Sequence, residues 1–160
     1  MTSDEDDPTV VAFPNKKKIS GSSTQRIWGK KVCEHGYAAI PSILIKAQKR
    51  LSIRPTEMNI LIQLLDHWID PARPPFPTKR QLAERMGITE KTLQNNMNSL
   101  EKKELVKRER RKTAAGDWTS NIYHLDGLVE KVQALEPDFT ETRRKKKAMQ
   151  EAAEGRYKGT

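Results

Sequence analysis

Residues 78–106 have the sequence TKRQLAERMGITEKTLQNNMNSLEKKELV, in which apolar residues recur at helical spacing on both sides of Gly87. Thr78 and Gln81 have the spacing of a capping box, in which the side chain of each bonds the backbone N–H of the other. This pair predicts where a first helix begins. Because glycine lacks a Cβ, it adopts a positive φ without steric cost, so we expect this helix to end at Gly87 in a sharp turn.

A second helix is expected from Glu90 to Lys103. Thr89 is a favourable N-cap, and Ile88 can pack on Leu93 as a hydrophobic staple that fixes how the chain enters the helix. The inner stripe has the spacing i, i+4, i+7: Leu93, Met97 and Leu100. The outer side is rich in Gln and Asn, whereas a side that provides only solubility favours Glu and Lys.

The pattern extends beyond these two helices, and the residues that carry it are Leu82, Ala83, Gly87, Ile88, Thr89, Leu93, Met97, Leu100, Leu105, Val106 and the run SNIYHL at 120–125. It resembles the winged helix-turn-helix family of DNA-binding proteins over about residues 37–135. YAAIP at 37–41 also resembles the first segment of helix-turn-helix proteins encoded by bacteria, phages and plasmids. The resemblance implies a mainly α-helical fold with a small β-hairpin wing. Glu104 departs from the family, many members of which carry glycine before the first wing strand, so this helix end can differ in shape.

Two strands are expected to form the hairpin, at residues 106–112 and 120–125. The second run alternates as a half-buried strand does. The first run is nearly all charged, so its assignment as a strand follows from the resemblance. Between them, Gly116 and Asp117 supply turn chemistry.

The hairpin is strongly basic, since five of the six residues at 107–112 are Lys or Arg. Beside a recognition helix, such a cluster is expected to lie along a phosphate backbone. Trp118 near the tip has two interpretations. It packs on the hairpin, which is the more common fate of a tryptophan, or it inserts at the edge of a DNA groove.

Further helices are expected before this region. Apolar spacing predicts a short helix over residues 41–50 and a longer one that begins at Pro55 and ends at Asp70, before Pro71. Residues 71–77, PARPPFP, are expected to form a stiff connection with few free amide donors.

A last helix is expected over residues 127–135, capped by Asp126 and ended by Pro137. Its apolar face packs either on the domain or against a second copy of the chain. The run RRKKK at 143–147 opens a polar segment without a wide apolar face. We expect this segment to be a mobile basic tail that adds sequence-independent affinity for DNA.

Three parts are therefore predicted. Residues 1–35 form a flexible arm, acidic at first and then basic, residues 36–136 form the winged helix-turn-helix domain, and residues 137–160 form a basic helical tail. The acidic start of the arm either stays solvated or screens the basic surface and contacts a partner. The lysine triplet at 16–18 is interpreted as a solvated run that can also contact phosphates.

Composition points to a polyanionic partner. The chain has 160 residues, 35% of them apolar, with 30 Lys and Arg against 21 Asp and Glu, a net charge of +9. One cysteine, Cys33, excludes a disulfide framework or a cysteine-rich zinc site and favours a reducing compartment. No apolar run approaches the ~20 residues that span a bilayer. We expect a soluble, cytoplasmic protein without a secretory signal or a membrane partner.

Site residues follow from the expected helix-turn-helix geometry. Gln and Asn can pair bidentately with adenine and Lys can donate to guanine, so we expect base contacts from Lys91, Gln94, Asn95 and Asn98. Contacts to phosphates are expected from Thr78, Lys79, Arg80, Thr89, Thr92, Lys107, Arg108, Arg110, Arg111 and Lys112.

No catalytic pattern is found in the sequence. The three histidines, His35, His67 and His124, are scattered, and there is no glycine-rich phosphate loop or paired-carboxylate motif. We therefore expect no enzyme activity, no metal, no cofactor and no small-molecule ligand.

The sequence thus predicts a sequence-specific protein that binds double-stranded DNA. The favoured role is a bacterial transcriptional regulator, most simply a homodimer on an inverted repeat, since the chain leaves no room for a second, enzymatic domain. One alternative is a plasmid or phage replication-initiation protein that binds repeated origin sites. Another is a winged-helix adaptor that binds protein within a larger complex.

Overall fold

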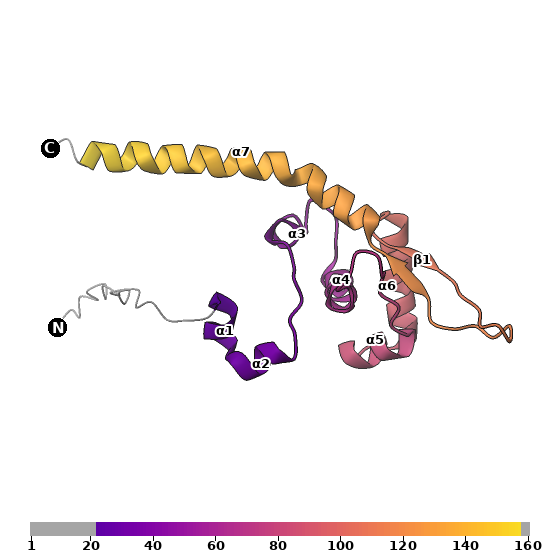
Figure 1. Ribbon diagram of the computed structural model, residues 1–160. Coiled ribbons are helices and arrows are strands. Elements are labelled where there is room, and N and C mark those ends of the chain that lie inside the picture. Colours follow the sequence, from indigo (N-terminus) through magenta and orange to yellow (C-terminus); the bar gives the residue numbers. More distant parts are fainter. Residues whose placement is uncertain (1–21, 158–160) are drawn as a thin grey trace, which may run out of the picture. The chain divides into compact units, whose positions relative to one another are not determined.

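The computed structural model describes residues 22–157, with side chains up to residue 155, and the chain divides into two units at Gly36 (Figure 1). The first unit contains α1 (Ser23–Trp28) and α2 (Lys30–Glu34). Residues 1–21, which include the acidic run and the lysine triplet, lie outside the described residues.

Most of residues 22–35, which the sequence places in a flexible arm, lie in these two short helices. Ser22 caps α1, since its Oγ accepts a hydrogen bond from the backbone N–H of Gln25 at 3.2 Å, and Gln25 completes a capping box. Neither α1 nor α2 has a buried residue. A side-chain cap is present only at the start of α1, since α2 begins after Gly29 without one.

The second unit is mainly α-helical with one two-stranded antiparallel sheet. Its elements in chain order are α3 (Ser42–Lys46), α4 (Pro55–His67), α5 (Lys79–Met86), α6 (Glu90–Lys102), β1 (Lys107–Glu109), β2 (Ile122–His124) and α7 (Asp126–Tyr157). Among the described residues, no helix is long and apolar enough to cross a bilayer.

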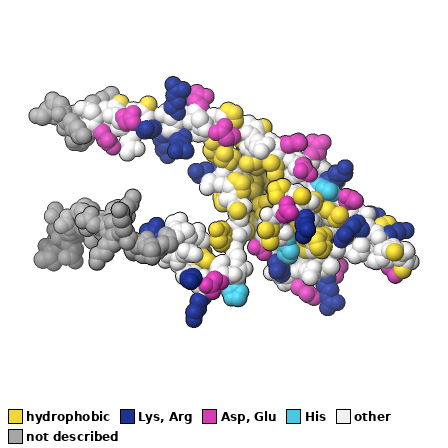
Figure 2. All heavy atoms as spheres, viewed as in Figure 1, with side chains coloured by type: hydrophobic (Ala, Val, Ile, Leu, Met, Phe, Trp, Pro, Cys, Tyr) yellow, Lys and Arg dark blue, Asp and Glu magenta, His cyan; other side chains and the backbone are white. Residues whose placement is uncertain are grey.

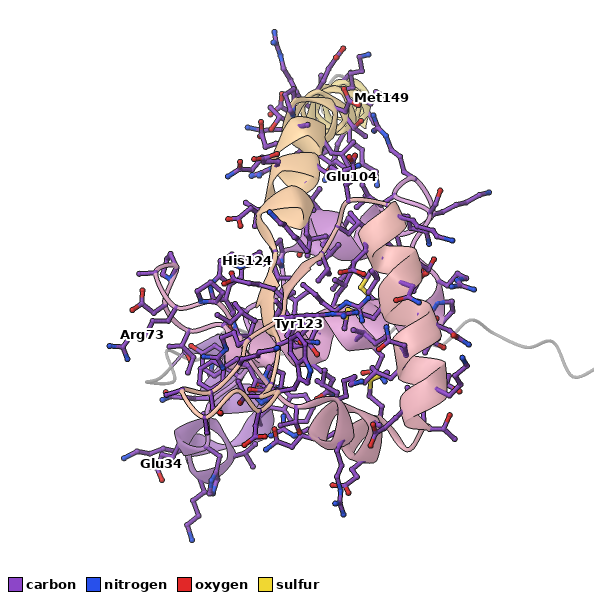
Figure 3. All side chains as sticks on the ribbon, turned by 90° about the vertical axis from the view of Figure 1, so that its right-hand side faces the viewer. Glu34, Arg73, Glu104, Tyr123, His124 and Met149 are labelled. Atoms are coloured by element: carbon purple, nitrogen blue, oxygen red, sulfur yellow. The ribbon has the colours of Figure 1, made fainter. Side chains whose placement is uncertain are left out.

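The core of this unit lies between α4, α5, α6, the hairpin and the start of α7. Ile60, Leu61 and Leu64 on α4 are completely buried and belong to one cluster with the inner residues of α5 and α6. Figure 2 shows apolar side chains gathered beneath α7, with charged side chains on the surface around them. Tyr123 of β2, labelled in Figure 3, is also fully buried, and burial raises the pKa of its hydroxyl.

The turn between α5 and α6 confirms the expected capping and glycine geometry. Thr78 Oγ1 accepts from the Gln81 N–H at 3.1 Å, and Gln81 Oε1 accepts from the Thr78 N–H at 2.9 Å. Gly87 has φ 64° and ψ 33°, in the left-handed region. Thr89 caps α6, because its Oγ1 accepts from the Thr92 N–H at 3.1 Å.

The hairpin is shorter than expected. Pairing is regular only between β1 and β2, where Lys107 lies opposite His124 and Arg108 opposite Tyr123. Nearer the tip, an isolated bridge joins Lys112 to Trp118. Between these two places Arg111 joins the two sides of the hairpin, since its carbonyl accepts from the Thr119 N–H at 3.1 Å and its Nε donates to the Ser120 carbonyl at 3.3 Å.

The two helices before the turn also differ from expectation at their ends. α3 covers five residues rather than the expected 41–50, and the chain continues as turns to residue 52. α4 ends at His67 rather than at Asp70, and Ile69, which the longer helix would have included, is 92% exposed. The backbone leaves the helix at Trp68, which has ψ 88°, so Ile69 no longer follows the helical spacing.

Glu104, which stands where many members of the resembled family carry glycine, is one of two described residues other than glycine with a positive φ. Its φ is 56°, in the left-handed region. The start of α7 lies directly against this turn, since a Cβ placed on Gly127 would be 2.1 Å from the Glu104 carbonyl oxygen. Gly127 is therefore required by close backbone approach rather than by its own φ.

The expectation that Pro137 ends the last helix was wrong. α7 continues through it as one helix of 32 residues (Figure 1). A proline removes one backbone donor, and here side-chain packing holds the helix on both sides of it, since Leu135 and Phe139 are half-buried. Arg50 also pairs with Asp138 at 2.5 Å. Nearer its start, α7 packs on the domain, one of the two expected alternatives, with Leu128 buried in the core.

A buried carboxylate connects α4 to the end of α6. Glu57 is completely buried, and its Oε2 lies 2.6 Å from Lys103 Nζ, while its Oε1 lies 2.9 Å from Arg54 Nη2. Burial by itself raises the pKa of Glu57, but hydrogen bonds from Arg54 and Lys103 outweigh it and lower the pKa to about 2. Lys103 also donates to the Ser52 carbonyl at 2.6 Å. The C-terminal end of α6 is thus fixed to α4.

Candidate nucleic-acid interface

The outer side of α6 carries the four side chains expected to contact bases, Lys91, Gln94, Asn95 and Asn98. Three are exposed, and Gln94 is half-buried. Gln94 Nε2 donates to Asn98 Oδ1 at 2.8 Å, one turn further along the helix. α6 carries one further asparagine, Asn96, whose side-chain amide donates to the Thr92 carbonyl at 2.8 Å. Its amide is therefore used within α6.

Arg108 of β1 ties the hairpin to α6. Its Nη2 bonds Asn98 Oδ1 at 2.6 Å and pairs with the Glu101 carboxylate, and its backbone N–H donates to Glu101 Oε1 at 3.1 Å. The hydrogen bond from Arg108 lowers the pKa of Glu101, and the same bond raises the pKa of Arg108. Only 14% of the Arg108 side chain is exposed. Its expected contact with phosphate stays a prediction, but its guanidinium already has partners within the protein.

Three of the expected phosphate contacts lie at the start of α5. Thr78 is the N-cap residue, and Lys79 and Arg80 are exposed in the first turn. Arg80 Nε pairs with Glu84 Oε1 at 2.9 Å on the same helix, and this bond raises the pKa of Arg80. The pair is exposed, so water and salt screen it and the guanidinium can still attract phosphate.

Two further hydroxyls lie at the start of α6. Thr89 and Thr92 are both exposed, and their Oγ1 atoms lie 3.0 Å apart. The first turn of a helix attracts anions, because its backbone N–H groups lack partners within the helix. The expected contacts of both hydroxyls with phosphate stay predictions.

The basic residues of the hairpin differ in how far their side chains are exposed. Lys107 and Arg110 are exposed. Arg111 is half-buried, with its guanidinium 5.4 Å from the centre of the Phe76 ring and its Nε 3.3 Å from the Ser120 carbonyl oxygen. Arg111 therefore attaches the hairpin to the proline-rich connection.

Lys112 and Trp118 form a pair at the far end of the hairpin. The Lys112 ammonium lies 4.5 Å from the centre of the indole. Trp118 is 66% exposed. Trp118 thus packs on Lys112 of the hairpin while most of its side chain stays exposed, and its insertion at the edge of a DNA groove stays a prediction.

Two adjoining hollows separate the start of α5 and the outer side of α6 from the hairpin. Both are lined by Lys79, Trp118, Thr119 and Asn121. One extends to Thr78, Arg80, Glu90 and Ser120 and the other to Gln94, Arg108 and Arg110. We call the two together the hairpin cleft. The fold thus brings residues from both expected sets, the base contacts and the phosphate contacts, to one concave and mainly basic surface.

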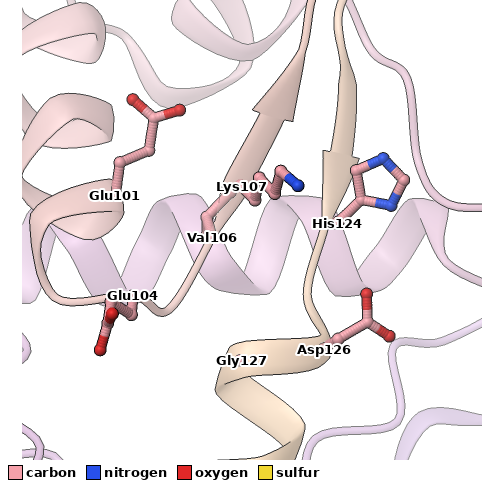
Figure 4. Close-up of a pocket in the computed structure, with 7 residues that line it drawn as sticks. All are labelled: Glu101, Glu104, Val106, Lys107, His124, Asp126 and Gly127. Carbon is pink, nitrogen blue, oxygen red and sulfur yellow. The ribbon is translucent and has the colours of Figure 1, made fainter.

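A different hollow lies where the hairpin meets α7 (Figure 4). Its lining includes three carboxylates, Glu101, Glu104 and Asp126, with Lys107 and His124. His124 Nε2 lies 2.8 Å from Glu109 Oε2. An excess of carboxylates repels phosphate, so this hollow does not suit nucleic acid.

Several residues of the surface were not predicted from sequence. Glu101 sets the position of Arg108, and Asn121 and Thr119 line the hairpin cleft. The alternation of the 120–125 run indicates which residues of β2 face outward, but no local signal joins Glu101 to Arg108. Within the described part of the chain, no group of three His, Cys, Asp or Glu residues could hold a metal ion.

Comparison with known proteins gives the family. The model of the DnaD N-terminal domain family matches residues 40–145. The N-terminal domain of DnaD protein from Geobacillus kaustophilus HTA426 is similar in structure, with a TM-score of 0.49, 23% identity, and 74% of this chain and 96% of that chain covered. A possible transcriptional regulator from Methanosarcina mazei Go1 gives a TM-score of 0.43 and 13% identity, with 64% and 82% covered. No curated protein matches the chain. Because the family model matches more than half of its length, the chain belongs to the DnaD N-terminal domain family.

Proposed function

We propose that this protein binds double-stranded DNA with sequence preference, in the manner of a winged helix-turn-helix. In this proposal α6 enters the major groove and the hairpin acts as the wing. The observation that carries the proposal is the exposed outer side of α6, which lies next to the basic hairpin cleft. Such a helix can place its polar side in the major groove while the basic hairpin lies along the phosphates.

The proline-rich connection supports the assignment of the hairpin as a wing. The Tyr123 N–H of β2 donates to the Pro75 carbonyl at 2.9 Å, so this connection lies along the free side of β2. Phe76 in the same segment contacts Arg111. The hairpin is therefore supported along its length and presents its basic residues in a fixed position.

Asn98 is proposed to read a base through its amide hydrogens. Arg108 carries only hydrogen-bond donors, so the amide oxygen of Asn98 must face it, and Gln94 donates to the same oxygen. The NH₂ group of Asn98 then points away from these partners. A donor in this position matches an acceptor such as guanine O6 or purine N7.

DNA replication is the biological setting that family membership favours. The chain belongs to the DnaD N-terminal domain family, which is linked to DNA replication. We therefore place an origin-binding or other replication role ahead of the transcriptional regulator that the sequence favoured. In either role the domain acts as a binding module rather than as an enzyme, and a homodimer on an inverted repeat stays a prediction.

An adaptor role is the second candidate, because the DnaD family also suggests protein partners. The salt dependence of binding to duplex DNA separates the two. A protein that makes 6 to 10 phosphate contacts loses about 10³- to 10⁵-fold in affinity between roughly 50 and 200 mM salt. We expect a loss of this order for the full chain, measured by fluorescence anisotropy. Absence of duplex binding, or binding that salt hardly changes, would favour the adaptor.

A further inference from the structure

The hairpin cleft contains an exposed aromatic ring, the indole of Trp118. Trp118 lines both hollows and is 66% exposed, although an indole is among the side chains that gain most from burial. Lys112 lies 4.5 Å from the centre of the ring and covers one of its faces. The bridge between these two residues holds the backbone beneath the ring in place. The other face of the indole is thus available to a ligand.

The rest of the cleft carries the groups that recognise a nucleotide. Asn121 and Gln94 supply amides and Thr119 supplies a hydroxyl, each able to bond the edge of a base. Lys79 and Arg110 line the same hollow and can neutralise a phosphate. The two hollows measure about 420 Å³ and about 340 Å³. Each is large enough to receive a base, since small-molecule sites begin at roughly 300 Å³.

An aromatic ring can stack only on a base whose face is free. Within a duplex both faces of each base are stacked on neighbours, and the Watson–Crick edge is paired. A base in single-stranded DNA offers both its face and its edge. The combination of a free indole face with amides and cations therefore fits an unpaired nucleotide better than the edge of an intact groove.

We propose that the hairpin cleft binds an unpaired nucleotide of a DNA strand that continues from the duplex held by α6, with its base stacked on Trp118. This inference rests on the proposed function, since α6 places the duplex end beside the cleft. It assigns the protein a preference for DNA with a junction between double and single strands. The sequence left open whether Trp118 inserts at the edge of a groove. Insertion at a groove edge requires only a duplex, whereas stacking on an unpaired base requires a single-stranded arm.

Binding of three kinds of DNA probe to the full chain tests the proposal. The probes are a blunt duplex, the same duplex with a single-stranded thymidine arm on either strand at either end, and the thymidine arm alone. Stacking of one base predicts that one of the armed duplexes binds about 10-fold more tightly than the blunt duplex. Trp118→Ala should abolish this gain, so that armed and blunt duplexes bind with equal affinity, and Trp118→Phe should keep part of it.

Trp28→Ala is the matched control, because Trp28 is 65% exposed and lies on α1. It should leave all affinities unchanged. Photo-cross-linking of wild-type protein to 5-iododeoxyuridine in the arm gives an independent readout, and we expect the modified residue to be Trp118. A cross-link confined to other residues contradicts the proposal.

Other outcomes separate this proposal from the proposed function. If no arm improves binding to the duplex, the cleft does not take an unpaired nucleotide, while duplex binding by α6 stands. If Trp118→Ala weakens blunt and armed duplexes by the same factor, Trp118 is a groove contact and the inference is wrong. Binding of the thymidine arm through Trp118 without any duplex binding would support the cleft and overturn the proposed role of α6.

Discussion

Asn95 and Arg110 represent the two kinds of contact that the interface is expected to make. Asn95 is exposed on the outer side of α6, and Arg110 is exposed on the hairpin and lines the hairpin cleft. An amide pairs with the edge of one particular base, whereas a guanidinium on a phosphate is indifferent to sequence. The two residues should therefore respond differently to substitution.

Asn95→Ala should weaken binding to the preferred site by about 1 to 3 kcal/mol and relax the base preference at one position. Arg110→Ala should weaken all duplexes similarly and reduce the slope of log affinity against log salt by about one. Anisotropy titrations with preferred and random duplexes measure both effects. Asn59→Ala, which removes an exposed asparagine of α4, is the control and should change neither. Equal effects of Asn95→Ala on both duplexes would contradict its role in base recognition.

The pair between Arg108 and Glu101 is predicted to stabilise the domain as well as position Asn98. Arg108→Met should lower the free energy of unfolding by about 1 to 3 kcal/mol, because a mostly sheltered carboxylate loses its charged partner. A double-mutant cycle with Glu101→Gln, followed by urea unfolding, isolates the coupling between the two side chains. Additive effects of the two substitutions would show that they do not depend on each other. Arg80→Met, which breaks a fully exposed pair, is the matched control.

The junctions between elements depend on two glycines for different reasons. Gly87 has φ 64°, and a Cβ added there would have nothing within 4 Å apart from its chain neighbours. A Cβ added to Gly127, by contrast, would lie 2.1 Å from the Glu104 carbonyl oxygen. Gly87→Ala should therefore cost about 1 kcal/mol from backbone strain alone. Gly127→Ala should cost more, about 2 to 3 kcal/mol, because the backbone of α7 must move away from the turn. Urea unfolding of both variants checks the order, and a larger loss for Gly87→Ala would contradict it.

The attachment of α6 to α4 through Glu57 predicts how stability depends on pH. The pKa of Glu57 is about 2 in the folded protein, against 4.5 for the ordinary side chain. Its contribution is therefore fully present above about pH 4.5 and is lost as the pH falls towards about 2, and amounts to roughly 3 kcal/mol. Urea unfolding of wild type and Glu57→Gln at several pH values should show the difference between them shrinking in acid.

Glu104→Gln is the control for this titration, since 84% of the Glu104 side chain is exposed. It should unfold with the same pH dependence as the wild type. A difference between wild type and Glu57→Gln that stays constant down to about pH 3 would mean that the folded pKa is not depressed.

Local rules predicted the elements whose ends are set by a few neighbouring residues. The Thr78 capping box, the left-handed turn at Gly87 and the Thr89 cap all depend on residues within four positions of each other, so the sequence contains them directly. α7 shows the limit of such rules. Whether a helix continues past Pro137 depends on packing with α3 and on the pair between Arg50 and Asp138, which are 88 positions apart.

In the candidate interface, too, the sequence predicted what depends on neighbouring residues and missed the contacts between distant ones. Periodicity placed Lys91, Gln94 and Asn95 on the outer side of α6, and the structure agrees. The partners of Arg108 were not predictable, because the hairpin must first fold back on α6 before Glu101 and Asn98 come within reach. The hairpin cleft likewise combines residues from three elements that no local pattern connects.

For the whole molecule, the excess of basic residues fits the polyanionic partner that we propose. The net charge is +9, and the chain belongs to the DnaD N-terminal domain family. The basic run of α7 is partly neutralised within the helix, since Lys145 pairs with Glu141 at 2.7 Å and Lys147 with Glu151 at 3.7 Å. Its sequence-independent contribution to affinity therefore stays a prediction, and the division into arm, domain and tail does too.

Nuclear magnetic resonance of the full chain with a duplex selected from a random pool tests the central claim most directly. We predict that the backbone amides of the outer side of α6, the start of α5 and the hairpin shift on titration, while those of Glu104, Asp126 and Gly127 in the hollow of Figure 4 do not. Shifts confined to α3, the far part of α7 or the Figure 4 hollow would contradict the assignment of α6 as the element that contacts DNA.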